Sequence, residues 1–391
     1  MNDLSAAKAW LTADQCDFEQ FRNTVEQPLT RESVPMASEI RERIPVYSGA
    51  EINEQWEDQH YVHALLTEWN NVFDSGAGVV VIEGAYPDTA PIEETTEALL
   101  HILEHERQND DSAGDHFAAA GANSRVWNAH EKLARVNPEL FTRYYANPAL
   151  HLGCWAWLGP NYQITAQVNV VHPGGAPQVC HRDYHLGFQS VDQLTSYPAN
   201  VHRVSPHLTL QGAIAHTDMS IDSGPTQLLP CSQQFYAGYM AAQLPRFRDY
   251  FNDHYVQLPL NTGDMMFFNP AVFHAAGENK TDKDRFANLL QVGSAFGRTT
   301  EVVDRTRLSK LIYPVLLKAR TNGLMSDGEI DNVIAATAEG YAFPCNLDLT
   351  PPIDGLAPPS QQELFRNLLQ DSVSPEEFNV EIQRWQDNRR S

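Results

Sequence analysis

The sequence predicts a mainly β protein of the α+β class, with a double-stranded β-helix core (the jelly roll of cupin-like proteins) between helical flanks. Two observations predict it. Between about residues 155 and 299, many short apolar or alternating segments are separated by turns rich in glycine, proline and aspartate; this is typical of a double-sheet jelly roll. On both sides of that stretch, apolar residues recur at helical spacing.

We therefore expect one domain built of three parts. Residues 1–150 form a mostly helical flank with one strand, residues 151–299 form the β-helix core, and residues 300–391 form a helical extension. In a chain of 391 residues, β-barrel-like cores of this size commonly belong to a single domain. The one strand expected in the first part is the buried run at residues 79–82.

The helical parts carry recognisable start signals. Apolar residues between positions 56 and 69, and again between 92 and 105, follow the helical period. In the extension, Ser326-x-x-Glu329 and Ser360-x-x-Glu363 are capping boxes, in which the serine and the glutamate satisfy free backbone amides of the first turn.

One strand candidate of the core has two distinct faces. Its apolar residues point one way and its polar residues the other; in such a core, a regular polar face is either solvated or the lining of a site. The apolar set is Ile164, Ala166, Val168 and Val170, and the polar set is Gln163, Thr165, Gln167 and Asn169. Further strands are expected at residues 208–215, 255–260, 265–268 and 286–292.

Composition excludes several classes of function. The formal net charge of −23 argues against binding to nucleic acid or to anionic membranes, which both need a basic surface. No run of apolar residues approaches the length of a membrane span, and the N-terminus lacks the pattern of a secretory signal. Five scattered cysteines without a C-x-x-C motif suggest neither a disulfide framework nor a zinc site. We expect a cytoplasmic protein, monomeric or homodimeric, that acts on a small molecule.

The residues that carry chemistry are His181 and Asp183, followed by His274 and Arg285. Side chains two apart on an extended segment point the same way, so His181 and Asp183 can share one metal. A second histidine from a distant strand completes two imidazoles and one carboxylate, the facial set that leaves open positions on Fe(II). Arg285 opens the next strand, and a guanidinium inside a barrel is costly unless it meets an anion such as a carboxylate.

With these residues the chain resembles the phytanoyl-CoA dioxygenase family of Fe(II)/2-oxoglutarate oxygenases over roughly residues 60–300. The matching pieces are Gln178-x-x-His181-x-Asp183, the turn at residues 224–230, Gly263-Asp264 with the strand that follows, and His274 with Arg285. The resemblance implies that His181, Asp183 and His274 hold the iron and act as the catalytic centre. It implies that Arg285 binds the distal carboxylate of 2-oxoglutarate, helped by Asn169 and Gln167.

The activity implied is hydroxylation of an aliphatic C–H bond of a small molecule, with O₂ consumed, succinate and CO₂ released, and ascorbate as an optional activator. Because Asp183 is present, the resemblance favours hydroxylation over halogenation, since related halogenases lack this carboxylate. Candidate substrate residues are Tyr184, His185 and Gln211. The family often has a hydroxyl residue two positions after the distal histidine, where this chain has Ala276; Thr281 or a water is the alternative second anchor.

Other interpretations of the function remain open from the sequence alone. A cupin-like metal-binding or sensing protein would keep the three ligands without oxygenase turnover and would not need Arg285. An interaction scaffold that has lost activity is a third possibility, against which the intact ligand set argues. A second His-x-Asp, His216 with Asp218, lacks a following histidine and arginine at matching spacing. Cys180 should point away from His181, because neighbours on a strand face opposite ways.

Overall fold

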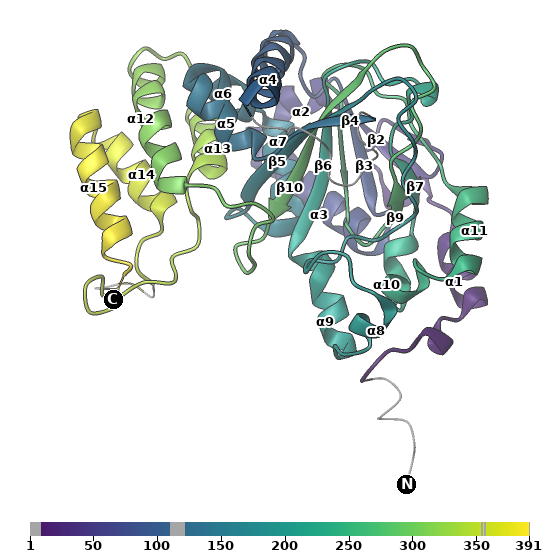
Figure 1. Cartoon of the computed structure of the whole chain (residues 1–391). Helices are drawn as coiled ribbons and strands as arrows, with labels where there is room; N and C mark the ends of the chain where they lie inside the picture. Colours follow the sequence, from purple (N-terminus) through teal and green to yellow (C-terminus); the bar gives the residue numbers. More distant parts are fainter. Residues whose placement is uncertain (1–8, 110–121, 353–354, 356, 391) are drawn as a thin grey trace.

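The computed structural model describes residues 9–109, 122–352, 355 and 357–390. A large sheet stands at the centre, with helices packed on one side and a smaller sheet on the other (Figure 1). The large sheet has eight strands in the order β1-β2-β3-β8-β6-β10-β5-β4, all antiparallel except the pair β2 and β3. The predicted α+β class, with helical flanks around a mostly antiparallel sheet, is confirmed.

The strands of the large sheet are β1 (Glu39–Arg41), β2 (Ile44–Ser48), β3 (Val79–Glu83), β4 (Asn123–Val126), β5 (Gln163–Val171), β6 (Thr209–Ala215), β8 (Met265–Phe268) and β10 (Arg285–Gly293). The small sheet pairs β7 (Gln227–Leu229) with β9 (Phe273–Ala275). Isolated bridges extend it, joining His181 to His274 and Val256 to Leu228.

The helices divide into three groups along the chain (Figure 1). Before the core come α1 (Phe18–Val25), α2 (Gly49–Gln55), α3 (Gln59–Ser75), α4 (Ala90–Asn109), α5 (Ala129–Val136), α6 (Pro138–Tyr145) and α7 (Pro148–Leu158). Within it lie α8 (Val191–Leu194), α9 (Ala199–Val204), α10 (Gly238–Ala241) and α11 (Pro245–His254). The C-terminal group is α12 (Arg305–Thr321), α13 (Asp327–Thr337), α14 (Gln361–Gln370) and α15 (Pro375–Asp387).

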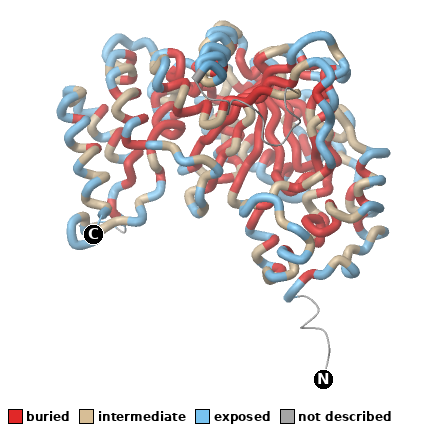
Figure 2. Tube along the Cα trace, in the orientation of Figure 1, coloured by how far each residue is buried: buried red, intermediate tan, exposed pale blue. Residues whose placement is uncertain are grey.

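Alternation along β5 decides how the layers meet. Ile164 and Ala166 join the largest apolar cluster, under α3, α6, α7 and the C-terminal helices, while Val168 and Val170 pack beneath α4 and α5. The opposite, polar face of β5 therefore looks toward the small sheet. A third cluster, including Met266, fills the space between the two sheets, and a fourth covers the outside of the small sheet. Figure 2 shows the buried chain concentrated in the sheets.

Three expectations about the elements were wrong. Residues 1–150 carry four strands, β1 to β4, where one was predicted. The β1–β2 hairpin turns through Glu42 and Arg43, both at positive φ, so the glycine or asparagine that usually marks such a turn is missing. β4 is short and mostly polar, which hides it from a search for apolar alternation.

The other two errors concern the start and the end of the core. α7 crosses the predicted boundary at residue 151; it is apolar on nearly all sides because it is buried, so it shows no helical stripe. Residues 255–260, predicted as a strand, make only isolated bridges. Both predicted capping boxes of the extension form. No helix in the described part of the chain is both long and apolar enough to cross a membrane.

Candidate metal centre

His181 and His274 face each other across the small sheet. They exchange both backbone hydrogen bonds, His181 N to His274 O at 3.0 Å and His274 N to His181 O at 3.1 Å. Directly opposed residues of an antiparallel pair place their side chains on the same face. The two imidazole centroids accordingly lie 4.4 Å apart. Residues distant in sequence are thus placed side by side by ordinary strand pairing.

Both imidazoles are oriented by the backbone. His181 Nδ1–H donates to the carbonyl of Val179, and His274 Nδ1–H donates to the carbonyl of Val272, each at 2.8 Å. A carbonyl can only accept, so in the neutral ring the proton sits on Nδ1 and the lone pair on Nε2. Burial, with His181 nearby, lowers the pKa of His274 to about 4. His274 is therefore neutral at physiological pH, the form in which it binds a metal.

Asp183 completes the set. Its two carboxylate oxygens lie 3.6 Å from His181 Nε2 and 3.9 Å from His274 Nε2. The backbone amide of Asp183 donates to Pro270 O at 3.0 Å, which ties the segment to the turn before β9. Gln211 Nε2, on β6 of the large sheet, donates to Asp183 Oδ2. The carboxylate is thus held from the facing sheet while both oxygens stay turned toward the histidines.

Together the three side chains could hold a metal ion. One ligand atom from each of His181, Asp183 and His274 lies within 4.8 Å of the others, and no second group of this kind occurs in the described chain. Two imidazole nitrogens and one carboxylate oxygen, each oriented by a hydrogen bond behind it, suit a non-haem Fe(II) facial triad. The donor set and its supports therefore fit iron.

Arg285 stands at the first residue of β10, buried with 7% of its surface exposed. Its Nη1 donates to Ser223 O at 2.8 Å and, at longer range, to Gly277 O. Burial lowers the pKa of Arg285 to about 10, which leaves it charged at neutral pH. No carboxylate of the described chain pairs with it. The register places Arg285 in line with Ala287, Leu289 and Gln291 on the face toward the small sheet.

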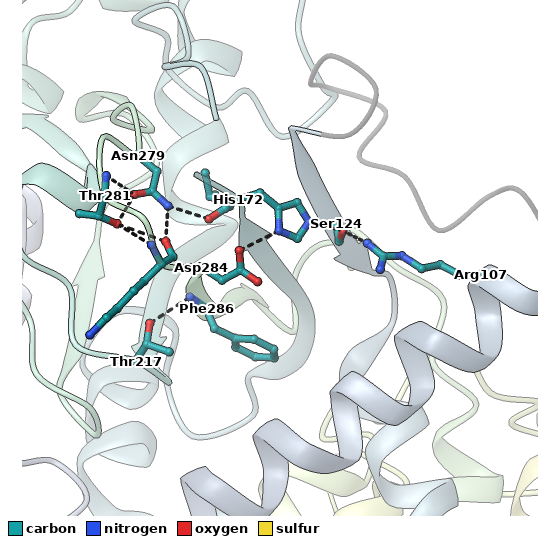
Figure 3. Close-up of polar contacts among 10 residues, drawn as sticks. Arg107, Ser124, His172, Thr217, Asn279, Thr281, Asp284 and Phe286 are labelled. Atoms are coloured by element: carbon teal, nitrogen blue, oxygen red, sulfur yellow. Dashed lines mark hydrogen bonds and ion pairs between the residues drawn. The ribbon is translucent and has the colours of Figure 1, made fainter. Parts of the chain in front are cut away.

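The loop between His274 and Arg285 is held by Asn279, which is fully buried (Figure 3). Asn279 Nδ2 donates to Val171 O at 2.9 Å and to Lys283 O at 2.8 Å. Its Oδ1 accepts from the amide and the hydroxyl of Thr281. The Thr281 hydroxyl is therefore engaged inside its own loop. The second anchor for 2-oxoglutarate, expected from Thr281 or a water, stays a prediction.

A second row of polar contacts braces the start of β10 (Figure 3). Ser124 Oγ contacts His172 Nε2 at 2.8 Å, and His172 Nδ1 contacts Asp284 Oδ1 at 2.9 Å. The residue types are those of a hydrolase triad, but Ser124 is buried and also accepts from Arg107 on α4. We interpret the row as a brace that joins β4, β5 and β10 beside Arg285.

The predicted cosubstrate residues lie on the polar face of β5. Asn169 is paired in register with Ala287, and its Oδ1 is buried without a hydrogen-bond partner in the described chain. Such an orphaned acceptor suggests a ligand or a water. Gln167 is already engaged, because its Oε1 accepts from Arg125 Nη1 at 3.0 Å. Sequence reasoning missed Arg125, since β4 was not recognised as a strand.

The candidate substrate residues separate into different surroundings. Tyr184 and Phe188 line a cavity beside His181, whereas Gln211 supports Asp183. His185 lies next to the metal-binding segment but hydrogen-bonds Thr209 Oγ1 at 3.0 Å and does not line that cavity. Cys180 is buried in the cluster outside the small sheet, away from the triad, as predicted.

The second His-x-Asp does not form a metal site. His216 is buried against Tyr144 and Thr96, with 2.8 Å contacts from its two ring nitrogens. Asp218 instead accepts from the amide and hydroxyl of Thr262 at the surface. The two side chains face different surroundings, because both residues lie beyond the end of β6 at Ala215, where the regular alternation of the strand no longer holds.

The comparison with protein families decides the identity. The family model described as phytanoyl-CoA dioxygenase (PhyH) matches residues 75–287, more than half of the chain. The chain belongs to the phytanoyl-CoA dioxygenase family. The predicted family is therefore confirmed. The triad and Arg285 all fall inside the matched region.

Individual relatives are more distant. The chain is 28% identical over 166 residues to dioxygenase sphC of Aspergillus fumigatus, an alignment that covers 39% of each protein. The chain thus spans about two fifths of the length of that relative. Among solved structures, this chain is similar to the carbocyclase SnoK from nogalamycin biosynthesis, at 20% identity and a TM-score of 0.45. The match covers 60% of this chain and 86% of SnoK. The chain is also similar to EvdMO1, at 15% identity and a TM-score of 0.42, and this match covers 59% of this chain and 50% of EvdMO1.

Proposed function

We propose that this protein hydroxylates an aliphatic C–H bond of a small organic molecule, using Fe(II), 2-oxoglutarate and O₂. One observation carries the proposal. Two histidines with Nε2 available and one carboxylate converge. The face of β10 toward the small sheet also carries a buried arginine that has no carboxylate partner in the described chain. A plain metal-binding protein would gain nothing from burying that guanidinium, whereas a dicarboxylate cosubstrate would pair with it.

Each residue of the chain has a part in this account. His181 and His274 present neutral nitrogens to the metal, and their Nδ1–H bonds to backbone carbonyls fix the ring planes. Asp183 supplies the anionic ligand, oriented by Gln211. When bound, the iron supplies the activation of O₂, with 2-oxoglutarate giving the electrons.

Arg285 would seat the distal carboxylate of 2-oxoglutarate, and its burial excludes water from that pair, which strengthens it. Asn169 offers its unpartnered carbonyl oxygen on the same sheet face. The balanced reaction converts a C–H bond, O₂ and 2-oxoglutarate into a C–OH group, succinate and CO₂. A cytoplasmic location and a monomeric or homodimeric state remain predictions.

The test is Fe(II)-dependent formation of succinate from 2-oxoglutarate in air, with pooled small organic molecules as substrates. We expect at least one pool to raise succinate formation in the wild type and none to do so in His274→Ala. Protein that binds both iron and 2-oxoglutarate, yet consumes no 2-oxoglutarate with any pool or alone, would contradict the proposal.

A further inference from the structure

A cavity of about 220 Å³ lies beside His181, on the outer side of the small sheet. Its walls come from the segment that carries the metal ligands and from α8, α10 and α11. Phe188 forms one side, with its ring 5.2 Å from the imidazole of His181 in an edge-on arrangement. His181 itself also lines the cavity, so the cavity borders the segment that carries two of the metal ligands. A water occupies roughly 30 Å³ in the liquid, so this cavity could hold a small organic group.

Two arginines line the cavity, Arg182 and Arg248. Arg182 is 6% exposed, and its guanidinium stacks on Tyr239 and Phe273 while Nη2 donates to the carbonyls of Ser232 and Phe235. Its Nε is buried without a partner in the described chain. The guanidinium lies against Gly238, where a Cβ would come within 1.8 Å of it. The site is thus built around this cation.

Arg248 enters from α11 on another side. Its Nε donates to Ala242 O at 2.8 Å, and neither of its Nη groups has a hydrogen-bond or ion-pair partner among the described residues.

One further polar group of the cavity wall lacks a hydrogen-bond partner in the described chain. The Tyr184 hydroxyl is buried and makes no hydrogen bond within the described chain. Gln243 contributes a carboxamide that donates to Gln189 O at 2.6 Å. The chain as a whole is acidic, with a net charge of −23, whereas the residues that line this cavity include two arginines and no aspartate or glutamate. Arg182 is buried and Arg248 is partly exposed, and a cation withdrawn from water is stabilised by an anion with hydrogen-bonding oxygens.

We propose that this cavity is an anion subsite, and that the substrate carries a carboxylate that binds there between Arg248, Arg182 and the Tyr184 hydroxyl. The inference deepens the proposed function and rests on it, because it names the class of substrate as organic acids. The anchored carboxylate would hold the rest of the molecule on the side of the cavity where His181 lies.

The test uses three probes with the same tail, namely hexanoate, hexanamide and hexylamine. Their dissociation constants are measured by ligand-observed NMR on the full chain without iron. Hexanoate should bind, and the amide and the amine should bind at least about tenfold more weakly, as expected for loss of a hydrogen-bonded charge pair. Equal binding of all three probes, or no binding of hexanoate, would overturn the inference.

Variants locate the site. Arg248→Gln removes the positive charge but keeps an unbranched polar side chain, and it should weaken hexanoate binding about tenfold or more. Arg246→Gln is the matched control, because Arg246 lies on the same helix with 68% of its side chain exposed; it should change nothing. Arg182 is a poor choice for this purpose because it also holds two backbone carbonyls.

Arg285 is a buried guanidinium at the cosubstrate position, to which hexanoate could also bind. Arg285→Gln should leave hexanoate binding unchanged. Binding lost in Arg285→Gln and kept in Arg248→Gln would place the carboxylate at the cosubstrate position and overturn the inference.

A paramagnetic ion separates this inference from the proposed function. With Co(II) added, the tail protons of bound hexanoate should broaden in the wild type but not in His274→Ala. If Co(II) does not bind while hexanoate still binds through Arg248, the proposed function fails and the anion subsite stands. If Co(II) binds and the tail does not broaden, the cavity is not part of the site, and its assignment as a substrate subsite is wrong.

Discussion

Gln211→Leu should weaken metal binding at the triad without touching any ligand. Gln211 Nε2 donates to Asp183 Oδ2, and leucine keeps a similar volume while removing the donor. A hydrogen bond to a charged acceptor contributes about 1.5–3 kcal/mol, and mutations behind metal ligands typically cost about 10- to 100-fold in affinity. Asp183 has 31% of its side chain exposed, so water can partly replace the amide. We therefore expect the lower end, about tenfold.

The assay is a titration of the metal-free protein with Co(II), followed by the visible absorption of the bound ion. Gln291→Leu is the matched control, since Gln291 lies beside Gln211 in register on β10, contacts it only at 3.4 Å, and is not bonded to Asp183. Circular dichroism verifies that both variants are folded. A dissociation constant for Gln211→Leu within twofold of the wild type would refute the idea that the large sheet orients the carboxylate ligand.

Two further predictions concern stability. Asn279→Ala removes four hydrogen bonds from a fully buried residue, so it should lower the free energy of unfolding in urea by about 2–4 kcal/mol. The control is Asn322→Ala at an exposed position, which should lower it by under about 1 kcal/mol. Equal effects of the two substitutions would contradict the role of Asn279. Burial lowers the pKa of His216 to about 3, so between that value and the unfolded pKa of about 6.5 only the unfolded chain takes up the proton. The contribution of neutral His216 to the free energy of unfolding is complete above pH 6.5 and is lost as pH falls, by up to about 1.4 kcal/mol per pH unit. In His216→Gln the free energy of unfolding should therefore fall less steeply between pH 6.5 and 5. An unchanged slope would show that His216 does not cause the decline.

The sequence predicted the site best where the alternation of residues along a strand also decides which face of the sheet a side chain occupies. The alternation along β5 predicted that Gln167 and Asn169 share one polar face, which the structure turns toward the small sheet. The spacing of His181, Asp183 and His274 identified three side chains that converge. Strand pairing explains this success, because a period of two fixes the face of every residue.

What the sequence could not show depends on contacts between distant segments. Gln211 was considered a substrate residue because its strand was recognised, but its bond to Asp183 needs the distance between the two sheets. Arg182 and Arg248 are 66 positions apart and carry no motif, so only the packing of α11 against the ligand-bearing segment brings both to one cavity. The β1–β2 hairpin was missed because Glu42 and Arg43 adopt positive φ without a turn signal.

The central claim is that His181, Asp183 and His274 hold Fe(II) while Arg285 seats 2-oxoglutarate. The most direct measurement is anaerobic: Fe(II) is added, then 2-oxoglutarate, and the weak visible charge-transfer band between the metal and the keto acid is recorded. We predict a band in the wild type, none in His274→Ala, and a much higher 2-oxoglutarate concentration for half-saturation in Arg285→Gln. Iron bound without a band in the wild type would contradict the claim and favour a metal-binding protein without oxygenase turnover.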